Sequence, residues 1–378
     1  MKLATRKDES RDGQLVVVSR DLKHAVMAGH ITGTLQRALD DWGFMAPQLQ
    51  DLYDSLNQGK AANSFPFDPA EYMAPLPRAH QRVEAQAWPA HEKRLHKAGL
   101  TQQPAPQPED GVPLRIAPSH VMFCGHGLIS LRFPLGQPAS APDDDGEAAD
   151  DGAASPTSPA PRAAARAGSS ASTTAAPAAG ASAADTASSG GLDFSAQLVA
   201  ICGDLPIDLD EDEADRHLLL LGLACSWHLY APSPNPLTRE QGRDRGLAFA
   251  PVLVTPDELG EDWREGRIHR PLHCRVNGRS TGRIDTGADM RFGFSQLMSV
   301  LSRQTPVGAG CVLASGPISN DDSDSGWASL LEARARRLLE KSTQPGPALL
   351  QPGDRLRIDM SDARGQSIFG IIEQQVVA

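Results

Sequence analysis

This chain of 378 residues has no long hydrophobic run, few aromatic side chains and no closely paired cysteines. No apolar run approaches the ~20 residues that a helix needs to cross a bilayer, so the sequence predicts no membrane-spanning helix. The cysteines are odd in number and never form a CxxC pair; they are Cys124, Cys202, Cys225, Cys274 and Cys311. This spacing favours reduced thiols over a disulfide framework or a cysteine zinc site. The opening residues, MKLATRKDESRDG, also lack the apolar core of a signal peptide, and we expect a cytoplasmic protein.

Positive charge is outnumbered: 36 lysines and arginines face 47 acidic residues, which gives a net charge of -11. A general electrostatic affinity for nucleic acid or for an anionic membrane is therefore not expected. The glycine-rich stretch 308–320 matches neither GxGxxG nor GxxxxGK[ST], so a nucleotide-phosphate loop is not favoured. His91 and His96 are five residues apart and diverge by about 140° on a helix, unlike the i, i+4 pair of a helical zinc site.

Residues 137–190 contain no large apolar side chain at all. Twenty of these 54 residues are alanine, and Val, Ile, Leu, Met, Phe, Tyr and Trp are missing. Such a segment buries too little apolar surface to offset an ordering entropy of roughly 1–2 kcal/mol per residue. With seven acidic residues and two arginines, it also carries about half of the net negative charge. We predict a disordered insertion, with an acidic recognition tail as the alternative.

The remaining sequence is typical of an α+β fold rich in strands. Residues 15–19 form a short β-prone run, and 34–42 and 46–57 have helical apolar spacing before the connector 64–77, which holds four prolines. Towards the C-terminus the patterns predict a strand in 247–260, a hairpin from 272, helices at 292–303 and 327–341, and a closing hairpin of 352–360 with 367–377.

The central stretch 192–230 organises the chain. Residues 193–202 alternate, which predicts a strand with Ser195 and Gln197 on one face and Phe194 and Leu198 on the other. The acidic residues of 208–215 favour a helix start, and the apolar run 218–224 then predicts the helix itself, which ends near Ser226.

Several short motifs resemble the fumarylacetoacetate hydrolase family. They are VTPDELG (254–260), GAG (308–310), SGPISN (315–320), PGDRLRIDM (352–360) and SIFGIIEQ (367–374). MKLAT, GQLVVVSRDL and LQRALDDW resemble the small N-terminal β-domain of one bacterial branch of that family. The resemblance implies a small β-barrel-like domain in 1–75 and a family-type β-roll or sandwich in 78–136 and 191–378. It also implies a homodimer.

The resemblance further implies a reaction, the hydrolysis of a carbon–carbon bond in a 1,3-diketo acid. In the family a divalent cation (Mg, Ca or Mn) held by four carboxylates polarises the diketone oxygens. A histidine oriented by a glutamate takes a proton from the attacking water, and a lysine stabilises the enolate oxygen.

Transferred position by position, these roles are only partly matched. His91 stands at the position of the base and Glu332 at that of its orienting carboxylate. Glu84, seven residues before His91, stands at the first metal position, where the family has Asp. The other family positions carry substituted residues: Ser195, Gln197 and Ser226 for metal ligands, Asp244 for the lysine and Pro317 for a threonine of the glycine-rich loop.

These substitutions reduce the charge of the metal position from about -4 to about -1, whereas hard cations prefer anionic oxygen. We therefore expect a weak or absent cation site and a weak or inactive hydrolase. The alternative is a non-catalytic member that binds an acid metabolite or a partner subunit, and a hydratase or decarboxylase is a third possibility. His91 could instead be an exposed residue of a charged helix, and Glu332 a solvated residue that pairs with Arg336 at i+4.

Overall fold

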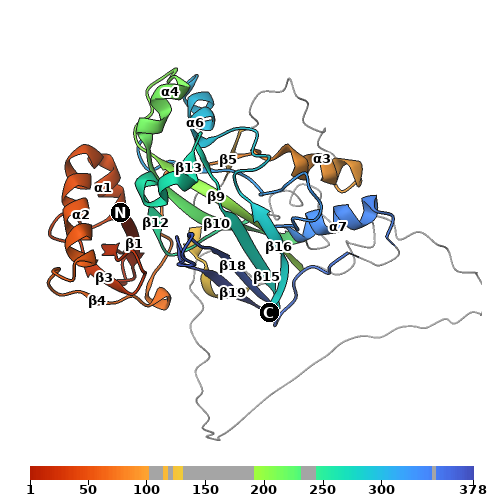
Figure 1. Cartoon of the computed structure of the whole chain (residues 1–378), viewed down its shortest axis with the longest axis horizontal. Helices are drawn as coiled ribbons and strands as arrows, with labels where there is room; N and C mark the ends of the chain where they lie inside the picture. The colour runs from red at the N-terminus through yellow and green to blue at the C-terminus, as the bar shows by residue number, and fades with distance from the viewer. Residues whose placement is uncertain (102–113, 118–121, 131–190, 231–243, 343–345) are drawn as a thin grey trace, which may run out of the picture. The chain divides into compact units, whose positions relative to one another are not determined.

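Two β-sheets form the framework of the computed structural model, which describes residues 1–101, 114–117, 122–130, 191–230, 244–342 and 346–378 (Figure 1). The predicted insertion, 137–190, lies outside these residues. Within them the chain is α+β and rich in strands, as the sequence predicts.

The larger sheet has twelve described strands. In sheet order they are β4 (Phe65–Pro66), β3 (His24–Met27), β2 (Gln14–Val18), β1 (Lys2–Arg6), β12 (Leu253–Val254), β10 (Leu218–Tyr230), β9 (Gly191–Cys202), β17 (Val312–Ala314), β5 (Arg82–Ala85) and β6 (Leu114–Ala117), with β11 (Asp244–Phe249) on β10 and β7 (Met122–Cys124) on β11. The second sheet follows the order β16 (Arg279–Asp285), β15 (Pro271–Val276), β18 (Arg355–Met360), β19 (Ile372–Val377) and β8 (His126–Ser130). A separate short pair joins β13 (Trp263–Arg264) to β14 (Arg267–Ile268).

Helices lie at the edges and faces of these sheets. They are α1 (Leu35–Asp40), α2 (Trp42–Asn57), α3 (Pro89–Lys97), α4 (Glu211–Ala214), α6 (Phe294–Ser302) and α7 (Leu330–Leu339), with 3-10 turns η1 (Pro69–Glu71), η3 (Asp215–His217) and η4 (Pro256–Asp262). In the described part of the chain, no helix has the length and apolar character needed to cross a membrane. The cytoplasmic location stays a prediction.

The N-terminal strands differ from the predicted barrel-like domain. β1, β2 and β3 pair in antiparallel order, β1 pairs with β12, and β12 in turn pairs with β10. In the residues described, the N-terminal strands are thus one open end of the large sheet, with α2 packed on β2. The structure therefore differs from the predicted barrel-like domain. β1 finds its second backbone partner in β12 of the large sheet, so the described N-terminal strands do not close on one another.

The run 218–224 is a strand and not the predicted helix. It belongs to β10, a strand of 13 residues that pairs antiparallel with β9 along its whole length. Only Glu211–Ala214 of the acidic stretch is α-helical. Leu218 to Trp227 are buried on both faces of the sheet, so the sequence lacks the alternation that reveals a strand.

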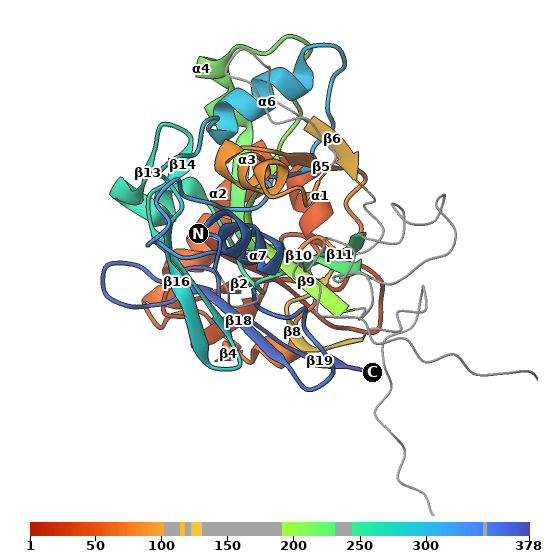
Figure 2. The same ribbon diagram turned by 90° about the vertical axis from the view of Figure 1, so that its right-hand side faces the viewer.

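Helices α3 and α7 lie against each other beside the large sheet (Figure 2). Pro89 opens α3 at the first helical turn, where its missing amide proton is not needed. Ser329 caps α7, since its side chain accepts a hydrogen bond from the Glu332 amide. Both helix starts are therefore fixed, which orients the side chains that face the partner helix.

Gly316 holds the loop after β17 close to β5. Its φ is +79°, and an added Cβ would lie 2.1 Å from the carbonyl oxygen of Ala85. Its amide donates a hydrogen bond of 3.1 Å to Oε1 of Gln197. A residue with a Cβ at this position would displace the loop from β5 and from Gln197 on β9.

We expect Gly316→Ala to lower the free energy of unfolding by more than the ~1–3 kcal/mol of a strained backbone conformation, because it adds a backbone clash. Gly353→Ala is the matched control, since Gly353 also has positive φ (+98°) but no atom within 4 Å of an added Cβ. Urea unfolding measures both. Equal losses in the two variants would contradict the close approach.

Candidate functional site

A polar row crosses one face of the large sheet. On β9 the two-residue period puts Asp193, Ser195 and Gln197 on one face, and Ser226 of β10 pairs directly with Ser195. β17 connects this face to β5, because Ala314 pairs with both Val199 and Glu84. The sheet thereby gathers four of the family positions: Glu84, Ser195, Gln197 and Ser226.

A buried guanidinium lies among these positions. The side chain of Arg82, two residues before Glu84, is 0% exposed. Its Nη2 donates to Oε1 of Glu84 and, at 3.2 Å, to Oγ of Ser226. Its Nη1 lies 3.3 Å from Oδ2 of Asp244. Arg115 donates to the other oxygen of Glu84.

The neutral family positions complete this network. Ser226 donates to Oε1 of Glu84 at 3.1 Å and accepts a hydrogen bond from Nε2 of Gln197. The Gln197 amide oxygen is occupied by the Gly316 amide. Pro317, at the threonine position, follows Gly316 in the same loop. The side chains of Glu84, Gln197 and Ser226 are therefore joined in one chain of hydrogen bonds.

The electrostatics of Glu84 follow from its two arginines. Burial raises the pKa of this carboxyl, but the charges of Arg82 and Arg115 outweigh burial and lower the pKa to about 2. Glu84 is therefore ionised over the whole physiological range.

This set of residues does not fit a divalent cation. Within the described ranges, no three His, Cys, Asp or Glu side chains come together as a metal site would require. The carboxylate of Glu84 is shared by Arg82, Arg115 and Ser226, and the neighbouring groups are neutral. Asp244, the predicted counterpart of the family's lysine, forms an ion pair with Arg82.

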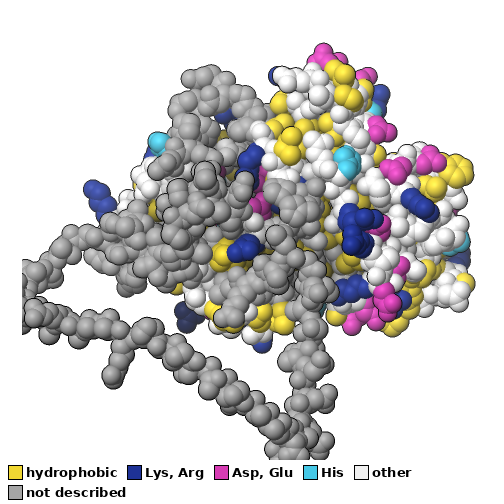
Figure 3. Space-filling view, turned by 180° about the vertical axis from the view of Figure 1, so that it is seen from behind, with side chains coloured by type: hydrophobic (Ala, Val, Ile, Leu, Met, Phe, Trp, Pro, Cys, Tyr) yellow, Lys and Arg dark blue, Asp and Glu magenta, His cyan; other side chains and the backbone are white. Residues whose placement is uncertain are grey.

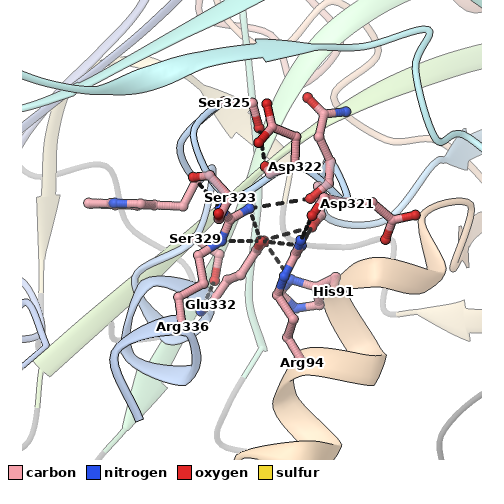
Figure 4. A network of polar contacts seen from close by, with 12 residues as sticks. His91, Arg94, Asp321, Asp322, Ser323, Ser325, Ser329, Glu332 and Arg336 are labelled. Atoms are coloured by element: carbon pink, nitrogen blue, oxygen red, sulfur yellow. Dashed lines mark hydrogen bonds and ion pairs between the residues drawn. The ribbon is translucent and has the colours of Figure 1, made fainter. Parts of the chain in front are cut away.

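A second cluster contains the predicted base and its partner. Figure 4 shows His91 and Arg94 projecting from α3 towards Glu332 on α7. Nδ1 of His91 lies 3.2 Å from Oε2 of Glu332, and both side chains are buried, at 6% and 0% exposure. The structure thus brings the two residues together, and neither is the solvated helix residue considered above.

Glu332 is held from several directions. Its Oε1 accepts hydrogen bonds from Arg94 at 3.0 Å, from Ser319 at 2.8 Å and from Arg336 at 2.8 Å. Burial raises the pKa of Glu332, but the hydrogen bond and charge of His91, with Arg336, outweigh burial and lower it. Burial lowers the pKa of His91, and the bond to Glu332 outweighs burial and raises it.

Asp193 connects this cluster to the sheet. It is 2% exposed and accepts hydrogen bonds from the Leu330 amide at 2.8 Å and the Ser329 hydroxyl at 3.3 Å. Burial raises the pKa of Asp193 although nearby His228 and His91 oppose the rise. Its contacts fix the first turn of α7, so we assign Asp193 a positioning role.

The chemistry open to the second cluster follows from the orientation of one ring. With its Nδ1–H donated to Glu332, His91 has Nε2 left to exchange a proton or to bind an anion. The bond to Glu332 raises the pKa of the ring above its ordinary value, so the same ring can hold a proton on Nε2 at lower pH and release it at higher pH.

Sequence reasoning missed several residues of these clusters, among them Arg82, Arg94, Asp193 and His228. Three of them could have been found, because each lies two residues from a family position on a strand and so shares its face. Arg94 lies three residues after His91, on the same side of α3.

The surface outside these clusters carries mixed charge. Figure 3 shows basic, acidic and hydrophobic side chains interspersed on the face that is not covered by grey atoms. Two surface cavities, of about 180 and 360 Å³, lie beside Thr34 and Arg78 and beside Lys2 and Arg364. Neither is lined by a residue of the two polar clusters.

Comparison with known proteins identifies the family. Residues 1–78 match the fumarylacetoacetase N-terminal domain 2, and residues 148–377, more than half of the chain, match the fumarylacetoacetate hydrolase C-terminal domain. The chain belongs to the fumarylacetoacetate hydrolase family. The recognition from sequence motifs is thereby confirmed. No curated protein sequence matches the chain.

Solved structures of low identity share the fold over the full length. A fumarylacetoacetate hydrolase from Exiguobacterium antarcticum has a TM-score of 0.58 at 15% identity, and covers 100% of this chain and 99% of its own. A maleylpyruvate hydrolase from Sphingobium sp. SYK-6, in complex with manganese(II) and pyruvate, has a TM-score of 0.55 at 13% identity and the same coverage. A probable 2-hydroxyhepta-2,4-diene-1,7-dioate isomerase from Mycobacterium abscessus has a TM-score of 0.57 at 13% identity, and covers 100% and 98%.

The lowered pKa of Glu84 predicts a specific loss of stability in acid. A carboxyl whose folded pKa is depressed stabilises the fold above its unfolded pKa of 4.5, and this contribution disappears as the pH falls towards the folded value of about 2. From pH 6 to pH 3 the contribution falls by about 2 kcal/mol. We expect Glu84→Gln to remove this part of the acid sensitivity in urea unfolding. Glu213→Gln, at an exposed carboxylate of α4, is the control, and an equal effect of both variants would refute the assignment.

Proposed function

We propose that this family member binds a small acid metabolite beside the His91–Glu332 pair, and that its metal-dependent carbon–carbon hydrolysis is weak or absent. The observation that carries the proposal is a buried imidazole oriented by a fully buried carboxylate, in a chain whose metal positions hold a protein cation.

The charge balance of the second cluster supports an acid ligand. Arg94, Arg336 and the imidazolium form of His91 surround the single carboxylate of Glu332. These three positive groups outnumber the carboxylates of Glu332 and Asp193, so the cluster favours an acid ligand, and Nε2–H of His91 is a charged donor for it. The related structures named above are hydrolases and an isomerase of acids by their titles, so the fold accommodates such ligands elsewhere.

The first cluster supports weak hydrolysis. The reaction that the resemblance implies needs an electrophile at the diketone oxygens, and the positions that would hold it have a single carboxylate, already bonded to Arg82. Asp244 replaces the lysine that would stabilise an enolate, and it is itself the counter-ion of Arg82. Slow hydrolysis with His91 as base is the second candidate function, because the orientation of its Nδ1 leaves Nε2 open for proton transfer.

The homodimer remains a prediction, which a measurement of the molecular mass in solution tests.

Calorimetric titration with pyruvate tests the acid site. We expect binding in the parent, and a loss of roughly tenfold to a hundredfold in His91→Gln, since a hydrogen bond to a charged group contributes about 1.5–3 kcal/mol. Binding should weaken as the pH rises through the raised pKa of His91, because the imidazolium is then lost. His96→Gln, at an exposed position of the same helix, is the control. Unchanged affinity in His91→Gln would exclude the site.

An acylpyruvate hydrolysis assay tests the chemistry. We expect at most a slow reaction in the parent, with no rise in rate when Mn²⁺ is added, because the Glu84 carboxylate is already bonded to Arg82, Arg115 and Ser226. Rapid hydrolysis that depends on Mn²⁺ would show that the chain is a metal-dependent hydrolase after all.

A further inference from the structure

The environment of Arg82 is unusual for an arginine. Its guanidinium is completely buried, and its partners come from three strands: Glu84 on β5, Ser226 on β10 and Asp244 on β11. A buried charge is tolerated only where paired groups replace its hydration. Here residues from three strands of the large sheet surround one guanidinium.

These partners coincide with substituted positions of the family. Glu84 and Ser226 stand at metal-ligand positions, Gln197 at a third donates to Ser226, and Asp244 stands at the lysine position. A planar guanidinium presents five N–H donors, so it can bind several oxygens of one site at once. Together with Arg115, Arg82 balances the two carboxylates of Glu84 and Asp244. The cluster has no excess negative charge to attract a divalent ion.

We propose that the guanidinium of Arg82 takes the place of the family's divalent cation, so that this chain carries its cation as part of the sheet. The substitutions at Gln197, Ser226 and Asp244 then belong to a single replacement of the metal ion by Arg82, and they are not three independent losses of function. A monovalent cation needs fewer anionic ligands than a divalent one, and neutral oxygens complete its shell. Asp244 supplies the counter-charge from the place where a lysine would repel Arg82. This inference does not depend on acid binding at His91.

Removal of Arg82 should leave a site that is stabilised by a bound divalent cation. In Arg82→Met the carboxylates of Glu84 and Asp244 lose the guanidinium that they share, although Arg115 still bonds to Glu84, and we expect the midpoint of thermal unfolding to fall. Millimolar Mn²⁺ should then raise the midpoint of the variant by about 2 °C or more, while that of the parent does not respond.

Arg270→Met is the matched control, because it breaks the ion pair with Asp262 outside the site. It should lose stability without any response to Mn²⁺. The inference is overturned if Arg82→Met responds to Mn²⁺ no more than Arg270→Met, or if the parent responds as strongly as Arg82→Met.

If Arg82→Met does not fold in the absence of a divalent cation, a refolding experiment tests the inference. Dilution from urea should then give folded protein with Mn²⁺ and none without it. A second variant combines Arg82→Met with Glu84→Gln and Asp244→Asn, and it should refold equally well with and without Mn²⁺ because the carboxylates are gone. If the triple variant folds and Arg82→Met refolds in neither condition, Arg82 is only a structural ion-pair partner and the inference fails.

Discussion

The antiparallel register of β9 and β10 is the constraint on which both polar clusters depend. It places Ser226 opposite Ser195 and His228 opposite Asp193, and it carries these residues on one face of the large sheet. A shift of either strand by one residue would turn the polar side chains of that strand to the other face, where Phe194 and Trp227 are packed. The long pair, buried except at the end of β10, therefore determines the positions of the polar clusters as well as the core.

Burial of charge explains the composition of the two clusters. Arg82 and Glu332 are both completely buried, and each is surrounded by groups of opposite charge: two carboxylates for Arg82, and two arginines with a histidine for Glu332. Removing one partner of such a cluster costs about 3–5 kcal/mol, because it leaves a charge without compensation. The arrangement thus resists stepwise change, and substitutions within it have to be correlated.

The sequence was informative where local periodicity and short motifs coincide. The family, the strand-rich α+β class and, through the family resemblance, the pairing of His91 with Glu332 were all accessible. The run 218–224 was assigned wrongly because a strand buried on both faces has no alternation. The pairing of β1 with β12 could not be inferred, since it joins residues about 250 apart in the chain and depends on backbone hydrogen bonds alone. Arg82 was overlooked although it shares a face with Glu84, because the family pattern directs attention to carboxylates.

Strand β9 also sets a length scale between the two clusters. Asp193 belongs to the cluster of His91 and Glu332, whereas Gln197 belongs to that of Arg82. Four residues of an extended strand separate their Cα atoms by about 13 Å. A two-carbon acid can therefore meet one cluster at a time, while a molecule with its acid group several bonds from a second polar end could approach both. The spacing along β9 thus sets how far apart two polar groups of one molecule must lie to reach both clusters, independently of the charge of that molecule.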